Sequence, residues 1–333
     1  MTSFARPTVE TGAGQGTGAR SAEPGWLRAW ADAWNAFWFT PSDPLPLAVI
    51  RIATGLLFTW ACIVWLLDVD AFFGTAGWLA PGNVWRMNDQ PWQWSWYFAA
   101  SSPTAIRVLA GITLAAAILL TVGLATPLAA VVSLAGFVSM ANRAPLNVFG
   151  FDDALGLLLV GLAVGPAGAR LSLDSLWGGA GPAGPSVRAT LALRLIQVHL
   201  CVVYFFSGGG KMLGASWWEG TALWGAVANV QYRTIDLTGL ARHPLVTNAL
   251  TLGTLFWEVS YPALVWPRLT RRLVLAAAVA VHLGIGLAMG MMEFGLAMIT
   301  ANLAFVPAAA WRSLGRRLTG RNGAHPGETA GRS

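Results

Sequence analysis

The chain has 333 residues, of which 55% are hydrophobic and only 11% are charged, and its mean hydropathy is +0.56. A soluble domain carries about 25% charged residues, so this composition excludes an ordinary soluble protein and indicates a polytopic membrane protein. The net charge of +6 does not indicate a nucleic-acid partner, because the basic residues are spread over loops and a C-terminal tail, as the positive-inside rule predicts. Cys62 and Cys201 lie in apolar segments without metal-ligand spacing, so neither a disulfide framework nor a metal site is expected.

The chain divides into four predicted regions. Residues 1–25 are small and polar and should be disordered. Residues 26–40 carry tryptophans and other apolar side chains at helical spacing, which predicts an amphipathic helix in the membrane interface. Residues 45–311 form the transmembrane domain, and residues 312–333 form a basic, disordered tail.

An all-α bundle of about eight spans is predicted, because each apolar run approaches the length of about 20 residues that a bilayer requires. The third and fourth runs are short, so they are expected to be tilted, re-entrant or extended by polar turns. The runs are Leu45–Leu67, Ala105–Leu124, Pro127–Met140, Ala154–Gly168, Ala189–Ser207, Val246–Trp266, Leu273–Gly290 and Phe294–Trp311.

The distribution of arginines predicts the orientation of these spans. Arginines precede the first run, flank the loop between the fourth and fifth, fill the loop between the sixth and seventh, and follow the last. With eight spans, all of them fall on one side, which the positive-inside rule assigns to the cytoplasm. We therefore expect a multi-pass protein of the cell (inner) membrane, in contact with the lipid bilayer and with both termini in the cytoplasm. The set comprises Arg6, Arg20, Arg28, Arg170, Arg188, Arg268, Arg271, Arg272, Arg312, Arg316, Arg317 and Arg321.

Two outer segments have both a structural and a functional interpretation. The first outer loop holds Trp78, Trp85, Trp92, Trp94 and Trp96, which could form an aromatic belt or a lid, or could wall a pocket for a flat, apolar ligand. The outer turn Asn142–Asp153 could be a salt-bridged turn or a polar cluster that binds something, with Asn142, Arg143 and Asp152 as its candidate residues.

Lys211 is the single lysine of the chain and follows three glycines at the end of an apolar run. The glycines predict a helix end or an unwound turn there. Tyr204, Trp217, Trp218 and Glu219 lie nearby in sequence. A lysine at such a place can be a snorkelling anchor. Alternatively, an amine partly removed from water becomes a general base, a role that arginine cannot fill.

Ionisable residues inside spans are functional candidates. His199, Glu258, His282 and the turn residue Glu293 belong to this group. A lone histidine in a helix bundle can equally be an interior residue with satisfied hydrogen bonds. Patterns of soluble enzymes such as a P-loop, GxSxG or HExxH are absent from the sequence, so an enzyme of this sequence would build its site from the outer ends of membrane helices.

The motif Tyr204-Phe205-x-x-Gly208-x-x-Lys211, followed by Gly214, Trp217 and Gly220, resembles the HTTM family, the membrane-domain relatives of vitamin K-dependent gamma-glutamyl carboxylase. The stretches 47–55, 142–153, 281–282 and 293–295 also fit, so the resemblance covers roughly 45–306. It implies that Lys211 is the base that deprotonates a reduced quinone of the vitamin K or menaquinone type, and that His282 lies near the quinol pocket. In the carboxylase the quinol then reacts with oxygen, and a substrate glutamate captures carbon dioxide.

The animal carboxylase carries a large extramembrane domain after its spans, whereas only a short polar tail follows Trp311. Processive carboxylation driven by such a domain is therefore not expected. We predict a carboxylase-like, quinol-linked enzyme (a lyase) that modifies a secreted peptide at the outer face. Lys211 is its catalytic residue, with His282, Glu219, Asn142, Arg143 and Asp152 in support, and Tyr204, Trp217 and Trp218 are its substrate-binding residues.

The alternative is a non-catalytic membrane partner in the maturation or export of a secreted peptide. The enzyme hypothesis predicts a closed apolar pocket that opens at Lys211. The partner hypothesis predicts an exposed Lys211, or a Lys211–Glu219 ion pair with no pocket beside it. A transporter is a third hypothesis. Against it, the sequence shows no clear internal repeat and no paired broken helices, which are expected of that class.

Overall fold

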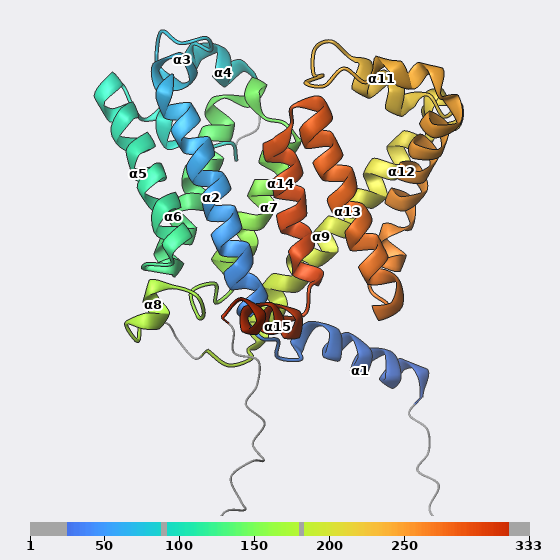
Figure 1. Cartoon of the computed structure of the whole chain (residues 1–333). Helices are drawn as coiled ribbons and strands as arrows, with labels where there is room; N and C mark the ends of the chain where they lie inside the picture. The colour runs from blue at the N-terminus through green and yellow to red at the C-terminus, as the bar shows by residue number, and fades with distance from the viewer. Residues whose placement is uncertain (1–24, 88–91, 180–182, 320–333) are drawn as a thin grey trace, which may run out of the picture. The chain divides into compact units, whose positions relative to one another are not determined.

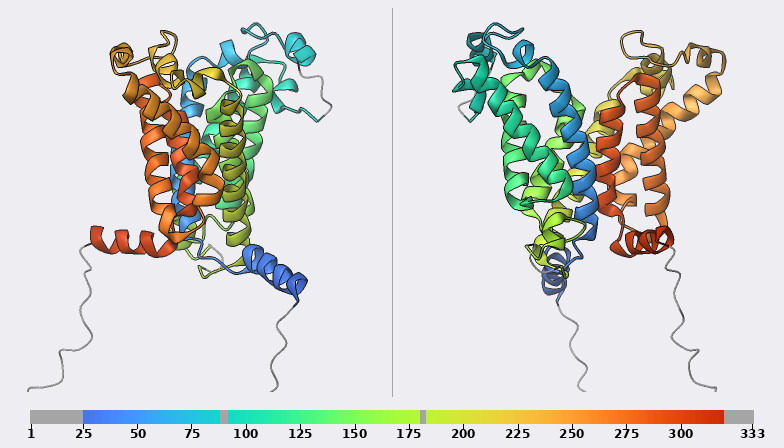
Figure 2. Two further views of the ribbon diagram at one scale, coloured as in Figure 1. Left: turned by 90° about the vertical axis from the view of Figure 1, so that its right-hand side faces the viewer. Right: turned by 60° about the vertical axis from the view of Figure 1, so that its left-hand side comes forward.

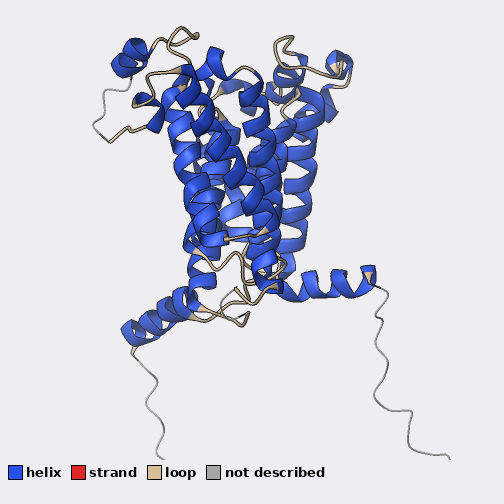
Figure 3. Ribbon diagram, turned by 90° about the vertical axis from the view of Figure 1, so that its left-hand side faces the viewer, coloured by secondary structure: helices blue, strands red, loops and turns tan. Residues whose placement is uncertain are grey.

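The computed structural model describes residues 25–87, 92–179 and 183–319. Its regular structure in these residues is helical, and the β-type pairing is limited to an isolated bridge between Ser42 and Ser186 (Figure 3). The described residues separate into two units, one that ends at Phe37 and one that begins at Trp38. The predictions for residues 1–24, including Arg6 and Arg20, and for residues 320–333, including Arg321, lie outside the described residues.

The first unit contains most of helix α1, Trp26–Phe39, which lies where the amphipathic helix was predicted. Trp30 and Trp34 are one turn apart and stack with their ring centroids 5.6 Å apart. Both side chains are more than half exposed. The helix therefore carries an exposed aromatic face.

The second unit is a bundle of helices whose ends fall into two groups (Figure 1). The short helices α3, α4 and α11 lie at one end, and α8 and α15 lie at the other. Each of the first seven predicted runs overlaps one helix, and the eighth, Phe294–Trp311, covers parts of more than one helix. The elements of this unit are α2 Leu45–Leu67, α3 Val69–Phe73, α4 Pro81–Met87, η1 Trp96–Phe98, α5 Pro103–Val122, α6 Thr126–Arg143, η2 Pro145–Asn147, α7 Gly150–Val164, α8 Leu173–Leu176, α9 Val187–Met212, α10 Ala215–Trp218, α11 Ala222–Ala228, η3 Thr238–Arg242, α12 Pro244–Leu264, α13 Arg268–Met289, α14 Met292–Asn302, η4 Leu303–Phe305 and α15 Ala308–Leu318.

Local sequence fixes many of these boundaries. The side chain of Ser102 accepts a hydrogen bond from the backbone of Ala105 at the start of α5, and Ser186 caps α9 in the same way. Helix α5 ends at Gly123, whose φ of 71° is left-handed. Only glycine is tolerated at this position, because a Cβ there would also lie 1.6 Å from Nη1 of the buried Arg51.

Among the described residues, four helices are long and apolar enough to cross a membrane: α2, α5, α9 and α13. The pair formed by residues 292–305 and α15 would be a fifth if it is one span, but it is bent by 108°. The molecule is thus a membrane protein by its long apolar helices. The predicted run Phe294–Trp311 is not one continuous helix, because Pro307 lacks an amide hydrogen and α15 starts after it in a new direction.

The predicted tail also begins too early. Helix α15 continues to Leu318 and includes Arg312, Arg316 and Arg317. Arg312 pairs with Asp43, which precedes α2. Residues 312–318 are therefore the later part of the amphipathic helix α15, which is held by an ion pair, and they are not part of a disordered tail.

Two sets of helices build the bundle. Helix α2 packs on α5, α5 on α6, and α6 on α7, while α9 packs on α12, and α13 on α14. Contacts of α14 with α2 and α7, and of α9 with α7, join the two sets. Figure 2 shows both sets from the sides. The Lys211 end of α9 belongs to the second set, far in sequence from the tryptophans of the first outer loop.

Candidate functional site

Lys211 lies in the last turn of α9, which runs without a break from Val187 to Met212. The three glycines are helical, so the prediction of an unwound turn there is wrong, whereas the helix end that they also indicated follows shortly after them, at Met212. A Cβ on Gly208 would lie 2.9 Å from Cγ2 and 3.0 Å from the backbone nitrogen of Val259 on α12, so this glycine lets the two helices approach closely. Small residues are used in this way where membrane helices pack. The run therefore shapes helix packing rather than a turn.

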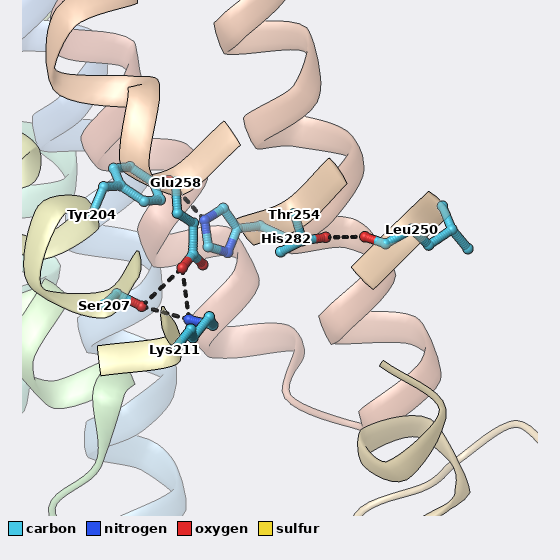
Figure 4. A network of polar contacts seen from close by, with 7 residues as sticks. All are labelled: Tyr204, Ser207, Lys211, Leu250, Thr254, Glu258 and His282. Atoms are coloured by element: carbon cyan, nitrogen blue, oxygen red, sulfur yellow. Dashed lines mark hydrogen bonds and ion pairs between the residues drawn. The ribbon is translucent and has the colours of Figure 1, made fainter. Parts of the chain in front are cut away.

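The Lys211 amine makes an ion pair across the interface between α9 and α12 (Figure 4). Its Nζ lies 2.7 Å from Oε2 of Glu258 and donates a 2.6 Å hydrogen bond to Oγ of Ser207. The Ser207 hydroxyl in turn donates to the same carboxylate oxygen at 3.3 Å. The side chains of Lys211 and Glu258 are 24% and 10% exposed, respectively, so this charged pair is largely withdrawn from water.

Helix α10, which follows α9 after a short turn, places an aromatic ring against the amine. Lys211 Nζ lies 5.4 Å from the centroid of the Trp217 ring, within the range of a cation–π interaction. The amine is thus held by a carboxylate, a hydroxyl and an aromatic face. Its position is fixed, as expected of a functional group and not of a solvated anchor.

A second polar network lies one to two turns deeper in the same helices. The Tyr204 hydroxyl lies 2.8 Å from Nε2 of His282 on α13 and accepts a 3.1 Å hydrogen bond from Nδ2 of Asn302. The Tyr261 hydroxyl donates to Oδ1 of Asn302 at 2.7 Å. All four residues are buried, and the network joins α9, α12, α13 and the end of α14.

Both networks border one cavity of about 910 Å³. Ser207, Lys211, Glu258 and His282 supply polar groups on its wall, and the ring of Trp217 and the side chain of Phe294 supply aromatic surface. Most of the remaining wall is apolar, from residues that include Leu157, Leu200, Val203, Leu223, Leu240, Leu250, Ile285 and Met298. The size lies within the range of ligand sites, about 300–1,000 Å³, that have an apolar lining and a few convergent polar groups.

Four of the predicted site residues meet at this cavity: Lys211, His282, Tyr204 and Trp217. The sequence did not place the late histidine near the lysine. The packing of α12 on both α9 and α13, with the hydrogen bond between Tyr204 and His282, brings the histidine to the same cavity. A cavity beside Lys211 is the arrangement that the enzyme hypothesis predicted. The ion pair with Glu219, which the partner hypothesis predicted, is replaced by the one with Glu258.

The two remaining predicted residues near Lys211 point elsewhere. Glu219 is exposed at the end of α10 and does not line the cavity. Trp218 is half exposed, and its ring nitrogen donates to the Met212 carbonyl at 2.7 Å. Only one of two adjacent tryptophans can face the amine, because neighbouring residues on a helix point in different directions.

The turn Asn142–Asp153 contributes differently from the prediction. Asn142 donates to the Trp94 carbonyl, Arg143 donates to the Gly74 carbonyl, and Asp152 accepts from the backbone of Phe149 at the start of α7. These three residues anchor loops and cap a helix, and none lines the cavity. Gly150 and Asp153 from the same turn do line it.

The tryptophans of the first outer loop do not wall this cavity. Trp78 and Trp85 are 73% and 55% exposed. Trp78 packs on Phe72 of α3, and Trp85 packs on Phe98. The prediction that they wall a pocket at Lys211 is therefore wrong, because the loop follows α2 in the other set of helices.

Sequence reasoning missed Ser207, Tyr261 and Asn302 as members of the site, and it included Glu258 only as an ionisable residue inside a span. Asn302 lies among apolar residues near the end of α14, which is a signal that could have been used. Ser207 lies one turn before Lys211, so their contact follows from helical spacing. The pairing of Glu258 with Lys211 depends on how two helices pack and has no local signal.

Comparisons with known proteins gave no match to this chain among family models, curated proteins or solved structures.

Proposed function

We propose that this chain is a multi-pass protein of the bacterial inner membrane, with eight spans and both termini in the cytoplasm. The helices that overlap the first seven apolar runs, together with α14 and η4 in the eighth, support the proposal. Arg312 belongs to α15 and Arg170 closely precedes α8, and both helices lie at one end of the bundle (Figure 1). Asp70 belongs to α3, and Lys211 lies near the end of α9, shortly before α11; α3 and α11 lie at the other end. The positive-inside rule assigns the first end to the cytoplasm, which puts the Lys211 cavity toward the outer face.

We further propose that the protein is an HTTM-family enzyme that binds a reduced quinone in this cavity and removes a phenolic proton from it. One observation carries the proposal: an amine and a carboxylate, 2.7 Å apart, stand on the wall of a large apolar cavity. The flat, apolar ring of a vitamin K or menaquinone type quinol matches a wall of this kind. An ionisable pair held near such a ring matches the chemistry of general acid–base catalysis.

Each residue then has a defined part. Lys211 meets the phenolic oxygen, and Glu258 takes the proton that the ammonium gives up before the amine acts as a base. Ser207 holds both groups in register through its two hydrogen bonds. Trp217 covers the amine, and Tyr204 with Asn302 sets the orientation of the His282 ring. Partial exclusion of water strengthens these electrostatic contacts.

The acceptor in this proposal is a secreted peptide that reaches the outer face. In the carboxylase-like reaction, the quinol and oxygen end as an epoxide and water, and a carboxyl group from carbon dioxide replaces a γ hydrogen of a glutamate side chain. The bound quinol supplies the reducing equivalents. The protein holds the quinol, moves its proton and limits the access of water.

Quinol turnover tests the proposal. The purified protein is given reduced vitamin K or menaquinone under oxygen, and epoxide formation is followed for the wild type, Lys211→Met, Glu258→Gln and Arg233→Gln. Arg233 is the control, because its ion pair with Asp236 lies in an exposed loop. We expect the two site variants to lose roughly 100-fold in rate or more, as for removal of a general base, and the control to keep its rate.

Equal turnover in the wild type and Lys211→Met would contradict the assigned role of the lysine. If the folded wild type does not bind either quinol in an equilibrium titration, the proposed activity is wrong. The non-catalytic role in maturation or export of a secreted peptide then becomes the better hypothesis.

A further inference from the structure

The cavity beside Lys211 has a roof toward the α11 end of the bundle. The roof is the segment from α11 to η3, and its side chains that line the cavity are apolar: Leu223, Ala226, Val227, Leu237 and Leu240. Hydrogen bonds tie the roof to two helices. The Leu223 amide donates to Oγ1 of Thr251 on α12 at 3.2 Å. The Thr234 amide donates to the Ala288 carbonyl of α13 at 3.0 Å. Apolar side chains thus separate the cavity from the α11 end.

Helices α12 and α13 form one side of the cavity and spread apart toward the α11 end (Figure 1, Figure 2). Near the short link that joins them they are in contact, since Nε1 of Trp257 donates to the Val274 carbonyl at 3.2 Å. Farther from the link, two residues of each helix, one turn apart, line the cavity. We call them the lateral gap: Leu250 and Thr254 of α12, and Ala280 and Gly284 of α13.

The lateral gap is open to the outside of the bundle. The side chain of Leu250 is 48% exposed, and Ala280 and Gly284 are exposed as well. A Cβ added to Gly284 would meet nothing within 4 Å among the described residues. The Thr254 hydroxyl donates to the Leu250 carbonyl at 2.8 Å (Figure 4), so its hydrogen is used within α12. The gap therefore gives access through an apolar rim.

Polarity increases from the gap inward. Leu250 and Glu258 lie two turns apart on α12 (Figure 4), and Glu258 carries the ion pair with Lys211. A molecule that lies through the gap would meet apolar groups at the rim and the charged pair inside. The wall at α7 and α9 suits a hydrocarbon less, because the exposed Asp153 and His199 line the cavity there.

We propose that the lateral gap is a portal that holds the hydrocarbon tail of a lipid-soluble substrate whose polar head lies at Lys211. This portal rests on the proposed function and makes its substrate more specific: a quinol with a long polyprenyl tail, taken sideways from the bilayer. In the proposed topology α12 and α13 span the membrane, so the gap faces lipid chains. Lipid chains are as apolar as the rim, so a tail that lies there remains in surroundings of the same kind.

Filling the gap tests the portal in the full-length protein in lipid nanodiscs. Gly284→Leu places a side chain in the gap, and Ala280→Leu does so one turn away. The control is Gly253→Leu on α12, because Gly253 is exposed and a Cβ there also meets nothing within 4 Å, but it does not line the cavity. Each protein is titrated with a long-tailed menaquinone and with menadione, which has no tail, both in the oxidised form.

We expect the two gap variants to bind the menaquinone roughly tenfold more weakly or worse, because the added side chain takes the place of the tail. They should bind menadione like the wild type, which also shows that they are folded. The control should bind both quinones like the wild type.

Photolabelling tests the same route without a quinone. A long-chain alcohol with a diazirine at the end of its chain is added to the nanodiscs and activated by light, and peptide mass spectrometry locates the adducts. Leu223 faces the cavity from the roof, whereas Phe256 on α12 is 57% exposed and does not line the cavity. We expect the ratio of adducts at Leu223 to adducts at Phe256 to fall severalfold in the gap variants and to stay unchanged in the control.

The two measurements separate failure of the portal from failure of the proposed function. Unchanged menaquinone affinity and an unchanged adduct ratio in both gap variants overturn the portal, even where the quinones bind. If neither quinone binds the folded wild type but the gap variants lower the adduct ratio, the portal stands and the quinol function is wrong.

Discussion

The Tyr204 hydroxyl on α9 lies 2.8 Å from Nε2 of His282 on α13, across 78 positions of sequence. Asn302 sets the direction of this hydrogen bond. Its Nδ2 donates both to the Met298 carbonyl and to the Tyr204 oxygen, so the one hydrogen of the tyrosine hydroxyl is available to donate to His282. A neutral His282 then carries its proton on Nδ1, a buried atom without a hydrogen-bond partner among the described residues.

Tyr204→Phe should destabilise the protein by about 1–3 kcal/mol, because it leaves buried groups of Asn302 and His282 without their partner. Thermal unfolding in detergent measures the change. Tyr232→Phe is the matched control, since Tyr232 is 42% exposed and outside the network. The ¹⁵N spectrum of labelled histidine should show Nδ1 of His282 protonated in the wild type. A spectrum with the proton on Nε2 would contradict the assigned direction.

Removal of either member of the Lys211–Glu258 pair should cost stability. Lys211→Met or Glu258→Gln leaves a poorly hydrated charge behind, and we expect a loss of about 2 kcal/mol, between the values for surface and fully buried pairs. The double variant Lys211→Met/Glu258→Gln leaves no charge and should recover much of this loss. Unfolding of all four proteins closes a double-mutant cycle. Additive losses would mean that the two side chains do not interact.

The three glycines before Lys211 should respond differently to alanine. A Cβ on Gly209 or Gly210 meets nothing within 4 Å, so alanine there should stabilise α9 by about 0.5–1 kcal/mol through helix propensity. Gly208→Ala should instead destabilise by about 1–3 kcal/mol, because Val259 would have to move. Thermal unfolding of the three single variants decides this. If alanine stabilised the protein at all three positions, Gly208 included, α9 and α12 would not be in close contact there.

Asp174, in the short helix α8, caps the start of α6. Burial alone would raise the pKa of its carboxyl, but hydrogen bonds from Thr126 and Ala125 outweigh this effect and lower the pKa below its ordinary value of 3.8. A lowered pKa in the folded state stabilises the protein above the unfolded pKa, and this contribution is lost as the pH falls through the folded pKa. We expect Asp174→Ala to cost about 1 kcal/mol near pH 7, as loss of a cap does.

The cost of Asp174→Ala should begin to shrink below about pH 4, the pKa of an aspartate in the unfolded chain, and it should vanish once the pH has fallen through the lowered pKa of the folded carboxyl. Unfolding temperatures of both proteins between neutral and acid pH test this, with Asp32→Ala in the exposed face of α1 as the control. A difference that stays constant with pH would mean that the ionised form of Asp174 is not what stabilises α6.

The sequence was sufficient to predict helices and many of their ends, because hydropathy and capping residues are local signals. Helix α2 has the bounds predicted for the first run. Sequence reasoning failed at the glycines of α9, because glycine serves either a turn or a close helix contact, and only the partner helix distinguishes these two uses. It failed again at Phe294–Trp311, where the apolar composition continues through a sharp bend at Pro307.

The candidate site was predictable only in part for the same reason. Lys211 and His282 were identified by their rarity in apolar runs. The partner hypothesis paired the lysine with Glu219, which directly follows Trp217 and Trp218. The ion-pair partner is instead Glu258, on another helix. Contacts between helices depend on rotation and crossing angle, which a single sequence does not specify.

The ion pair between Arg312 and Asp43 has a consequence for the order of the chain. It brings α15, the last helix, to the turn that precedes α2, so the bundle begins and ends at one place. Domains with adjacent ends tolerate circular permutation. A permuted chain that joins residue 318 to residue 41 by a short linker and opens between α8 and α9 should therefore fold with the Lys211 cavity intact, because each set of helices that forms the bundle stays continuous.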